Sequence, residues 1–235
     1  MLYSIVFALA WIILRVFYIF LGGISFEGVE NVPLKGPVII TPNHVSDADP
    51  PTICLALPRR CWTMAKSELF ESRFLGFMIR LFHGFPVKRN SLDFVALRKA
   101  EQLLKEGNAI LLFPEGECSE DGTLQPMLPG ALLLAQRSGS LIVPTALLGT
   151  NLIMPYSKLI PRPSWRKTIV RFGPPISPDV LMGGSKGGSA YKLGAARLYA
   201  AILSLQQGRP YPDFNDIQLL EKPSEFREKI IRASK

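Results

Sequence analysis

The chain of 235 residues is long enough for one domain with a sizeable core. Its 48% hydrophobic content excludes an intrinsically disordered protein and agrees with membrane contact. The net charge is +8. Its three cysteines include no Cys-x-x-Cys pair and predict neither a disulfide framework nor a zinc site, so we expect reduced thiols in a domain that faces the cytosol.

The first 24 residues are almost continuously apolar, with Arg15 as the one charged residue. Twenty helical residues extend for about 30 Å, which is the thickness of a hydrocarbon core. A secretory signal and a buried core helix are the alternatives. The signal is disfavoured because no basic residue precedes the apolar run and no small-residue cleavage pattern follows it. We therefore expect a membrane-associated helix, which either crosses the bilayer or lies in one leaflet.

Beyond residue 24, short apolar runs alternate with segments of helical periodicity. The predicted strands are Val38–Thr41, Cys61–Ala65, Phe85–Val87, Ala109–Phe113, Leu141–Leu148 and Thr168–Phe172. The predicted helices are Arg73–Phe82, Ser91–Glu106, Ala131–Arg137, Ala190–Gln206 and a short charged helix from Ser224. This alternation predicts an α/β fold with a mixed, largely parallel sheet flanked by helices.

The clearest predicted helix runs from Ser91 to Glu106, where Ser91 suits the N-cap and Gly107 the stop. The chain is accordingly divided into an N-terminal anchor helix (1–24), one α/β domain (25–208) and a C-terminal tail with a short helix (209–235).

A basic segment runs from Ser157 to Pro178, and it contains no acid but does contain Trp165. Its basic residues are Lys158, Arg162, Arg166, Lys167 and Arg171. The segment is either an ordinary solvated surface or one that meets anionic lipid headgroups, where each cation contributes about 1 kcal/mol. Nucleic acid is a third option, but no nucleic-acid-binding motif supports it, so we expect no such partner.

One of only two histidines, His44, follows a predicted strand in the sequence Asn43-His-Val-Ser-Asp-Ala-Asp49. Strand ends are where α/β folds place reactive groups. The imidazole can take a proton at neutral pH, and the carboxylate of Asp49 can accept the other ring N–H and fix the tautomer. The alternatives are a loop histidine bonded to a helix-capping carboxylate, or a metal site that includes Asp47. One histidine and two aspartates form a poor zinc set.

A second candidate site, Phe113-Pro-Glu-Gly-Glu-Cys-Ser119, follows another predicted strand. Its Glu115 lies in a tight turn, and Gly116 permits a close approach by a ligand. The carboxylate can accept hydrogen bonds from substrate hydroxyls. The alternative is an ordinary solvated turn acid.

Four sequence blocks follow one another along the chain: Asn43-His-x4-Asp49, Phe85-Pro-Val-x-Arg89, Phe113-Pro-Glu-Gly-x-x-Ser119 and Val143-Pro144. In order and spacing they resemble the motifs of the glycerolipid acyltransferase family, whose best-known members acylate lysophosphatidic acid. Met64-Ala-Lys-Ser-Glu-Leu69 resembles the family's stretch between the first two. The resemblance extends from about Gly28 to Pro175.

The resemblance implies that residues 25–208 are an acyltransferase domain with His44 and Asp49 as the catalytic pair. It implies acyl transfer from acyl-coenzyme A or acyl-carrier protein to the hydroxyl of a lysophospholipid. For the acceptor 1-acyl-sn-glycerol-3-phosphate the product is phosphatidic acid, in phospholipid biosynthesis. Arg89, Glu115 and Gly116 would bind the acceptor. We expect no cofactor and no metal, and we expect membrane lipids as partners, with the domain on the cytoplasmic face of a single-pass or monotopic protein.

Two positions depart from the family pattern: Cys118 replaces a usual Arg, and Leu128 replaces a common Lys. Both lost cations could contact an acceptor phosphate, through bonds of about 1.5–3 kcal/mol each. Either Arg89, Lys88 or Lys66 binds the phosphate instead, or the acceptor headgroup differs. The alternatives are therefore an acyltransferase or transacylase for another lysolipid, and a catalytically silent lipid-binding protein of the same fold.

Overall fold

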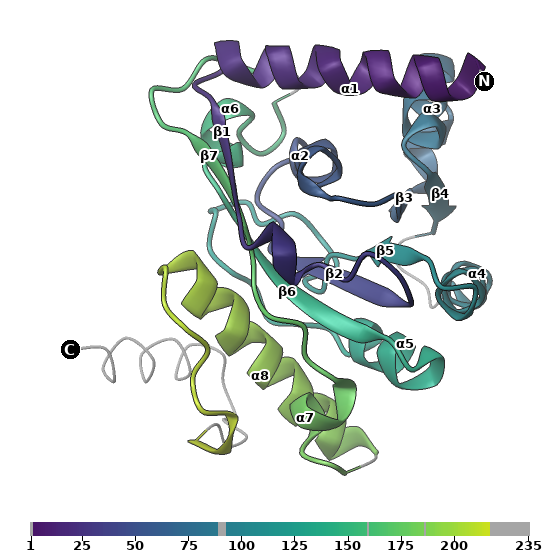
Figure 1. The fold of residues 1–235 in the computed structure, drawn as a ribbon, viewed down its shortest axis with the longest axis vertical. Coiled ribbons are helices and arrows are strands. Elements are labelled where there is room, and N and C mark those ends of the chain that lie inside the picture. The colour runs from purple at the N-terminus through teal and green to yellow at the C-terminus, as the bar shows by residue number, and fades with distance from the viewer. Residues whose placement is uncertain (1, 89–92, 159, 186, 217–235) are drawn as a thin grey trace.

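The computed structural model describes residues 2–88, 93–158, 160–185 and 187–216. Seven strands form one sheet in the order β1-β7-β6-β2-β5-β3-β4 (Figure 1). The strands are β1 Ile24–Glu27, β2 Val38–Pro42, β3 Cys61–Lys66, β4 Gly84–Val87, β5 Ala109–Leu111, β6 Leu141–Leu148 and β7 Thr168–Phe172. All neighbouring strands run parallel except β6 and β7, which are antiparallel. This is the mixed, largely parallel sheet that the sequence predicts.

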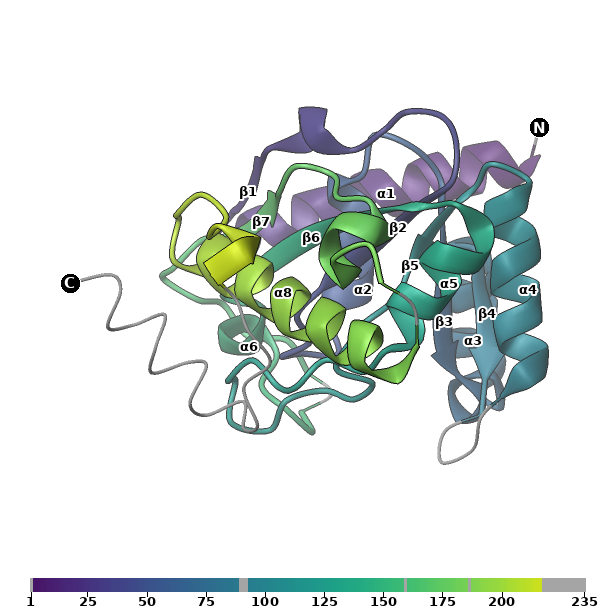
Figure 2. The same ribbon diagram turned by 90° about the horizontal axis from the view of Figure 1, so that it is seen from below.

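Helices cover both faces of the sheet, as Figures 1 and 2 show. On the upper side in Figure 1 lie α1 Leu2–Phe20, α2 Asp49–Ala56, α3 Arg73–Leu81 and α6 Thr150–Ile153. On the lower side lie α4 Phe94–Lys105, α5 Gly130–Ser138, α7 Pro178–Met182 and α8 Gly188–Gln206. The three-layer arrangement buries the central strands on both faces, which explains why they read as nearly continuous apolar runs.

Successive side chains of the central strands point to opposite faces of the sheet, so the core consists of two parts. Ile39, Ile110 and Ile142 point to one face and pack with residues of α4, α5 and α8. Ile40 and Val143 point to the other face and pack with residues of α2. All five side chains are completely buried, and burial of one such side chain stabilises the fold by about 1.5–3 kcal/mol.

The start of α4 differs from the sequence prediction. The helix begins at Phe94, and the N-cap is Asp93, whose Oδ1 accepts hydrogen bonds from the amides of Val95 (3.1 Å) and Ala96 (3.0 Å). A carboxylate satisfies two otherwise unpaired amides and interacts favourably with the helix dipole. The predicted cap, Ser91, lies outside the described residues and precedes the observed cap by two positions.

The N-terminal apolar segment forms α1, and the end of this segment packs into the domain. Tyr18 and Leu21 are buried in a cluster with Leu55 of α2 and Ile153 of α6. Most other described side chains of α1 are exposed, among them Ile13 (65%) and Phe20 (75%). Over the described part of the chain, no helix is long and apolar enough to span a bilayer.

The chain after α8 returns to the domain surface. The hydroxyl of Tyr211 donates a hydrogen bond to the Pro174 carbonyl at 3.0 Å, and Phe214 packs against the same core cluster as α8. The charged helix expected from Ser224 lies outside the described residues. Tyr211 and Phe214, which belong to the predicted tail, thus contact the domain.

Candidate active site

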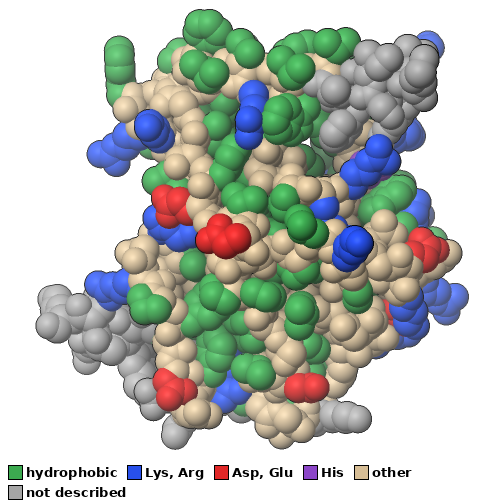
Figure 3. Space-filling model, viewed as in Figure 1, with side chains coloured by type: hydrophobic (Ala, Val, Ile, Leu, Met, Phe, Trp, Pro, Cys, Tyr) green, Lys and Arg blue, Asp and Glu red, His purple; other side chains and the backbone are tan. Residues whose placement is uncertain are grey.

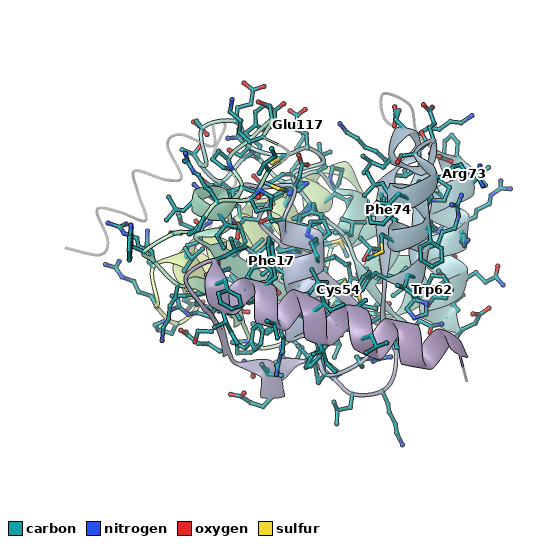
Figure 4. All side chains as sticks on the ribbon, turned by 90° about the horizontal axis from the view of Figure 1, so that it is seen from above. Phe17, Cys54, Trp62, Arg73, Phe74 and Glu117 are labelled. Atoms are coloured by element: carbon teal, nitrogen blue, oxygen red, sulfur yellow. The ribbon has the colours of Figure 1, made fainter. Side chains whose placement is uncertain are left out.

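The sheet topology brings the two candidate motifs to one edge. Strands β2, β5 and β3 are parallel neighbours, so their carboxyl ends lie on the same side of the sheet. His44 follows β2, Glu115 follows β5, and Lys66 is the last residue of β3. Figure 4, which looks down on α1, shows Glu117 of the loop after β5 in the upper part of the view, beyond that helix. Such an edge is where open α/β sheets place their sites.

His44 and Asp49 form a hydrogen-bonded pair. The His44 Nδ1 atom lies 2.9 Å from Asp49 Oδ2, as the five-residue spacing predicts. Asp49 is completely buried and is the first residue of α2, where the helix dipole favours a carboxylate. The two prolines that follow it suit the first turn of a helix, because their missing amides would be unpaired there anyway.

Backbone amides hold the carboxylate in place. The Oδ2 atom of Asp49 also accepts hydrogen bonds from the amides of Val45 (2.7 Å) and Ser46 (2.9 Å). Because these donors fix the position of the carboxylate, Asp49 can orient the ring and stabilise it once it is protonated. In the neutral ring the Nδ1 proton faces Asp49, which leaves Nε2 as the base.

The ring of His44 is fixed by packing as well as by hydrogen bonding. It stacks on Phe113, with ring centroids 4.0 Å apart and an angle of 25° between the planes. The residue is 7% exposed, so only a small part of it reaches the surface. The two motifs of the sequence therefore meet at this ring, one supplying the base and the other its support.

Glu115 is buried and already engaged on both oxygens. Its Oε1 atom accepts a hydrogen bond from the His44 amide at 2.6 Å, and Oε2 accepts one from the Gln125 amide at 2.7 Å. Burial raises the pKa of Glu115 to about 7, and the two amides partly oppose this increase. The alternative of a solvated turn acid is wrong, because Glu115 is only 5% exposed. The structure gives this side chain a positioning role, and its contact with an acceptor stays a prediction.

Gly116 is required by its backbone conformation and by its neighbour. Its φ angle is +82°, a region that residues with a side chain rarely adopt. A Cβ atom here would lie 2.6 Å from Cδ1 of Leu128. The group that approaches Gly116 closely is thus the side chain of Leu128, which is itself 55% exposed.

The predicted cationic residues fall partly within the described chain. Lys66 ends β3 and pairs in register with Val87 of β4, so Lys88 continues the same edge. The Lys88 amide donates to Asp93 Oδ2 at 2.9 Å. Arg89 lies outside the described residues. Lys66 and Lys88 thus share the sheet edge on which His44 lies, and their contact with an acceptor stays a prediction.

The alternative of a metal site gains no support from the geometry. Asp47, the acid that it needs, is exposed, whereas Asp49 is buried against His44. Within the described ranges, no group of three His, Cys, Asp or Glu side chains is arranged to hold a metal ion.

Two buried residues hold the motif in ways that the sequence reasoning missed. Asn43 bonds to both backbone groups of Leu147, at 3.0 Å through Nδ2 and 2.7 Å through Oδ1, and so fixes the end of β2 to β6. Ser46 donates from its Oγ to the Met154 carbonyl at 2.7 Å. Asn43 lies inside the first motif block. Because its side-chain amide has the same donor and acceptor as a peptide group, its bonding to the backbone of a neighbouring strand could have been predicted.

A third missed residue is Tyr18 at the end of α1. It is buried, and its hydroxyl bonds to Thr52 of α2, three residues after Asp49. Burial, and to a lesser degree the charge of Asp49, raises the pKa of Tyr18 to about 12. The apolar N-terminal helix therefore contacts α2, the helix that carries Asp49.

The chain belongs to the Acyltransferase family, whose sequence model matches residues 23–148, more than half of the chain. This confirms the family predicted from the four motif blocks and identifies residues 23–148 as an acyltransferase domain.

The similar proteins are named as acyltransferases of one kind. The chain is 34% identical over 137 residues to the chloroplastic 1-acyl-sn-glycerol-3-phosphate acyltransferase LPAT1 of Arabidopsis thaliana, covering 56% of this chain and 38% of the relative. It is 33% identical over 132 residues to the 1-acyl-sn-glycerol-3-phosphate acyltransferase of Bacillus subtilis, covering 55% and 65%. The chain thus matches less than two thirds of the length of these relatives.

A solved structure has the same fold. The crystal structure of the 1-acyl-sn-glycerophosphate (LPA) acyltransferase PlsC from Thermotoga maritima matches with a TM-score of 0.64 and 26% sequence identity. The match covers 80% of this chain and 73% of that one.

Proposed function

We propose that the protein transfers a fatty acyl group from a thioester donor to the free hydroxyl of 1-acyl-sn-glycerol-3-phosphate, giving phosphatidic acid. The observation that carries this proposal is the His44–Asp49 hydrogen bond of 2.9 Å at the carboxyl edge of the sheet. The names of the relatives agree with it. The thioester is already activated, so the reaction requires only an acyl-coenzyme A or acyl-carrier-protein donor and no cofactor.

In this mechanism His44 acts as general base and then as general acid. Its Nε2 atom takes the proton of the acceptor hydroxyl while the oxygen attacks the thioester carbonyl carbon. The tetrahedral intermediate collapses with cleavage of the carbon–sulfur bond, and the departing thiolate takes the proton from the imidazolium. Asp49 stabilises the charged ring between the two steps.

The geometry also limits where the oxyanion of the intermediate can bind. The amides of Val45 and Ser46 donate to Asp49, and the amide of Ser119 donates to the His44 carbonyl at 2.8 Å. These three amides are therefore engaged, and the donors for the oxyanion come from other groups.

Membrane association is part of the proposal. The exposed apolar side chains of α1 suit an interfacial position, and Figure 4 shows Phe17 on this helix. We place α1 at the membrane, with the domain on the cytoplasmic face, where its cysteines remain reduced. Membrane lipids, the thioester donor and the lysophospholipid acceptor are then the partners.

A second acceptor class is favoured by one observation. Leu128, an uncharged side chain, covers Gly116 at the position where the family commonly has Lys. If the cations at Lys66, Lys88 and Arg89 do not bind a phosphate, a lysolipid with a different headgroup fits the site better. A panel of lysolipid acceptors tested with one labelled thioester donor separates the two.

The His44→Ala variant tests the proposal. We expect loss of acyl transfer by at least about 100-fold with unchanged association with vesicles, because general acid–base catalysis contributes about 10²–10⁴-fold. The matched control is His83→Asn. His83 precedes β4 and therefore lies at the opposite edge of the sheet, and its φ of 59° is one that Asn tolerates. Full turnover in His44→Ala would refute the mechanism.

A further inference from the structure

Residues 155–158 and 160–167, which we call the basic loop, carry side chains that the proposed chemistry does not use. Its Trp165 is completely exposed, and Ile160 is 83% exposed. The loop contains no acid. Its basic residues, all exposed, are Lys158, Arg162, Arg166 and Lys167. An exposed Trp among cations is the side-chain combination that suits a membrane–water interface.

Backbone hydrogen bonds attach the basic loop to the end of α1. The Ser164 amide donates to the Leu21 carbonyl at 2.8 Å, and the Thr168 amide donates to the Gly23 carbonyl at 3.0 Å. The close contact leaves no room at Gly22, where a Cβ atom would lie 2.1 Å from the Ser164 carbonyl oxygen. Trp165 is therefore held next to the final turn of α1.

The neighbouring end of α1 is itself apolar and exposed. Ile19 is 68% and Phe20 is 75% exposed. Figure 3 shows hydrophobic side chains over α1 along the top of the molecule and basic side chains at its left end, where the basic loop lies in Figure 1. Apolar side chains and cations thus form one continuous surface.

A second backbone hydrogen bond, near the middle of the basic loop, connects the loop to the neighbourhood of His44. The Arg162 amide donates to the Ile153 carbonyl at 2.8 Å, and the next carbonyl, that of Met154, accepts from Ser46. Ser46 lies two residues from His44. The basic loop therefore lies between the end of α1 and the segment that carries the base.

We propose that the basic loop and the last turn of α1 together bind the surface of a bilayer that contains anionic lipids. Trp165 lies among the headgroups, and the four cations contact their phosphates. This inference rests on the membrane association proposed above and adds a second contact with the membrane. That contact orients the segment that carries His44 toward the lipid. The charge complementarity selects an anionic surface over a neutral one.

Trp165 itself reports the contact. The chain has three tryptophans, so the variant Trp11→Phe/Trp62→Phe leaves Trp165 as the single fluorophore. We expect its emission to shift to the blue, and to be quenched by brominated lipid, with vesicles of phosphatidylcholine and phosphatidylglycerol. With phosphatidylcholine alone both effects should be much weaker. Unchanged Trp165 emission while the protein sediments with the anionic vesicles would overturn the proposal, and so would a shift caused by an oligonucleotide but not by vesicles.

A charge-matched pair of variants tests the cations. Arg166→Gln/Lys167→Gln should weaken binding to the anionic vesicles at least tenfold. Arg98→Gln/Lys192→Gln removes the same charge from α4 and α8, on the lower side of the sheet, and should leave binding within about twofold of the parent. Equal losses in both variants would show a nonspecific charge effect and refute the surface.

Activity in detergent micelles separates this inference from the proposed function. Arg166→Gln/Lys167→Gln and Arg98→Gln/Lys192→Gln should both keep the parent rate in micelles, because none of these residues belongs to the candidate active site. An inactive parent protein in micelles with every donor and acceptor would refute the proposed function and leave the vesicle result to decide the lipid surface alone.

Discussion

Two loops of the molecule can be compared: residues 43–48, which follow β2 and which we call the catalytic loop, and the basic loop, which precedes β7. Both loops bond to residues 153–154, but they differ in how firmly they are held and how exposed they are. Hydrogen bonds with Glu115, Asp49 and Leu147 hold the catalytic loop, and its histidine is almost buried. The backbone amides of Arg162 and Ser164 bond the basic loop to the domain, and most of its side chains are exposed. A base that must meet a reacting atom needs a fixed position, whereas a surface that meets lipid needs exposed charge and can tolerate movement.

The largest difference between the two loops should appear when the catalytic carboxylate is replaced. In Asp49→Asn the amide no longer stabilises the imidazolium and can favour the wrong tautomer, so we expect kcat to fall by about 10²–10⁴-fold with little change in KM. The measurement is steady-state acyl transfer from a labelled thioester. A decrease of less than tenfold would mean that the catalytic loop is not held for catalysis.

The next largest effect is expected on stability, when Glu115 is replaced. This residue holds the catalytic loop by accepting a hydrogen bond from the His44 amide. In Glu115→Gln the amide group offers one acceptor in place of two, so one buried backbone N–H loses its partner. We expect the free energy of unfolding to fall by about 1–3 kcal/mol, measured by denaturant titration in detergent. The control is Glu117→Gln, an exposed change two residues away, which should be neutral.

Glu115 should also leave a signature in the pH dependence of stability. Its pKa is raised from 4.5 to about 7 in the folded protein, so between these values the folded state keeps a proton that the unfolded state has lost. Stability from this group is complete below pH 4.5 and is lost as the pH rises through about 7. We expect Glu115→Gln to remove this decline from melting curves recorded between pH 5 and 8. An identical decline in that variant would assign it to another group.

A smaller effect should follow from cutting the connection between the two loops. Ser46→Ala removes the hydroxyl that donates to Met154 and accepts from the Ala48 amide at 3.0 Å. We expect about 1 kcal/mol of lost stability and a several-fold decrease in kcat, since the ring is held less rigidly. Ser46→Thr, which keeps the hydroxyl, should recover part of the kcat, and failure to do so would argue against the bond.

The smallest effect on stability should come from the basic loop. Trp165→Ala should change the free energy of unfolding by less than about 0.5 kcal/mol, because the side chain is exposed. Acyl transfer in micelles should likewise stay at the parent rate, while transfer on anionic vesicles falls several-fold. A stability loss above about 1 kcal/mol would mean that Trp165 is part of the packing and that the two loops are more alike than they look.

Much of the fold could be predicted because the apolar runs are periodic. All six predicted strands are present, within two residues at each end, and β2 and β6 were visible as buried apolar runs. Strand β1 was missed because it continues the apolar N-terminal segment without a break in composition. Helix α2 was missed because two prolines follow its first residue and it has too few turns to show a period.

The site could be predicted in its parts but not in its connections. The spacing of His44 and Asp49 predicts their hydrogen bond, which a short chain segment can form by itself. The hydrogen bond from the His44 amide to Glu115 joins residues 71 positions apart, so it depends on the order of β2 and β5 in the sheet. The order of the strands in the sheet cannot be read from a local sequence pattern. The same applies to Asn43 and Leu147, which are brought together by β6.

The burial of Tyr18 and Leu21 bears on any attempt to make a more soluble version of this protein. Deletion of the whole N-terminal segment up to residue 24 would expose Leu55 and Ile153 and would remove the hydroxyl bonded to Thr52. A shortened chain that keeps residues 18–24 would retain these contacts while losing most of the exposed apolar helix. The place of the cut therefore decides whether truncation gives a soluble enzyme or a damaged one.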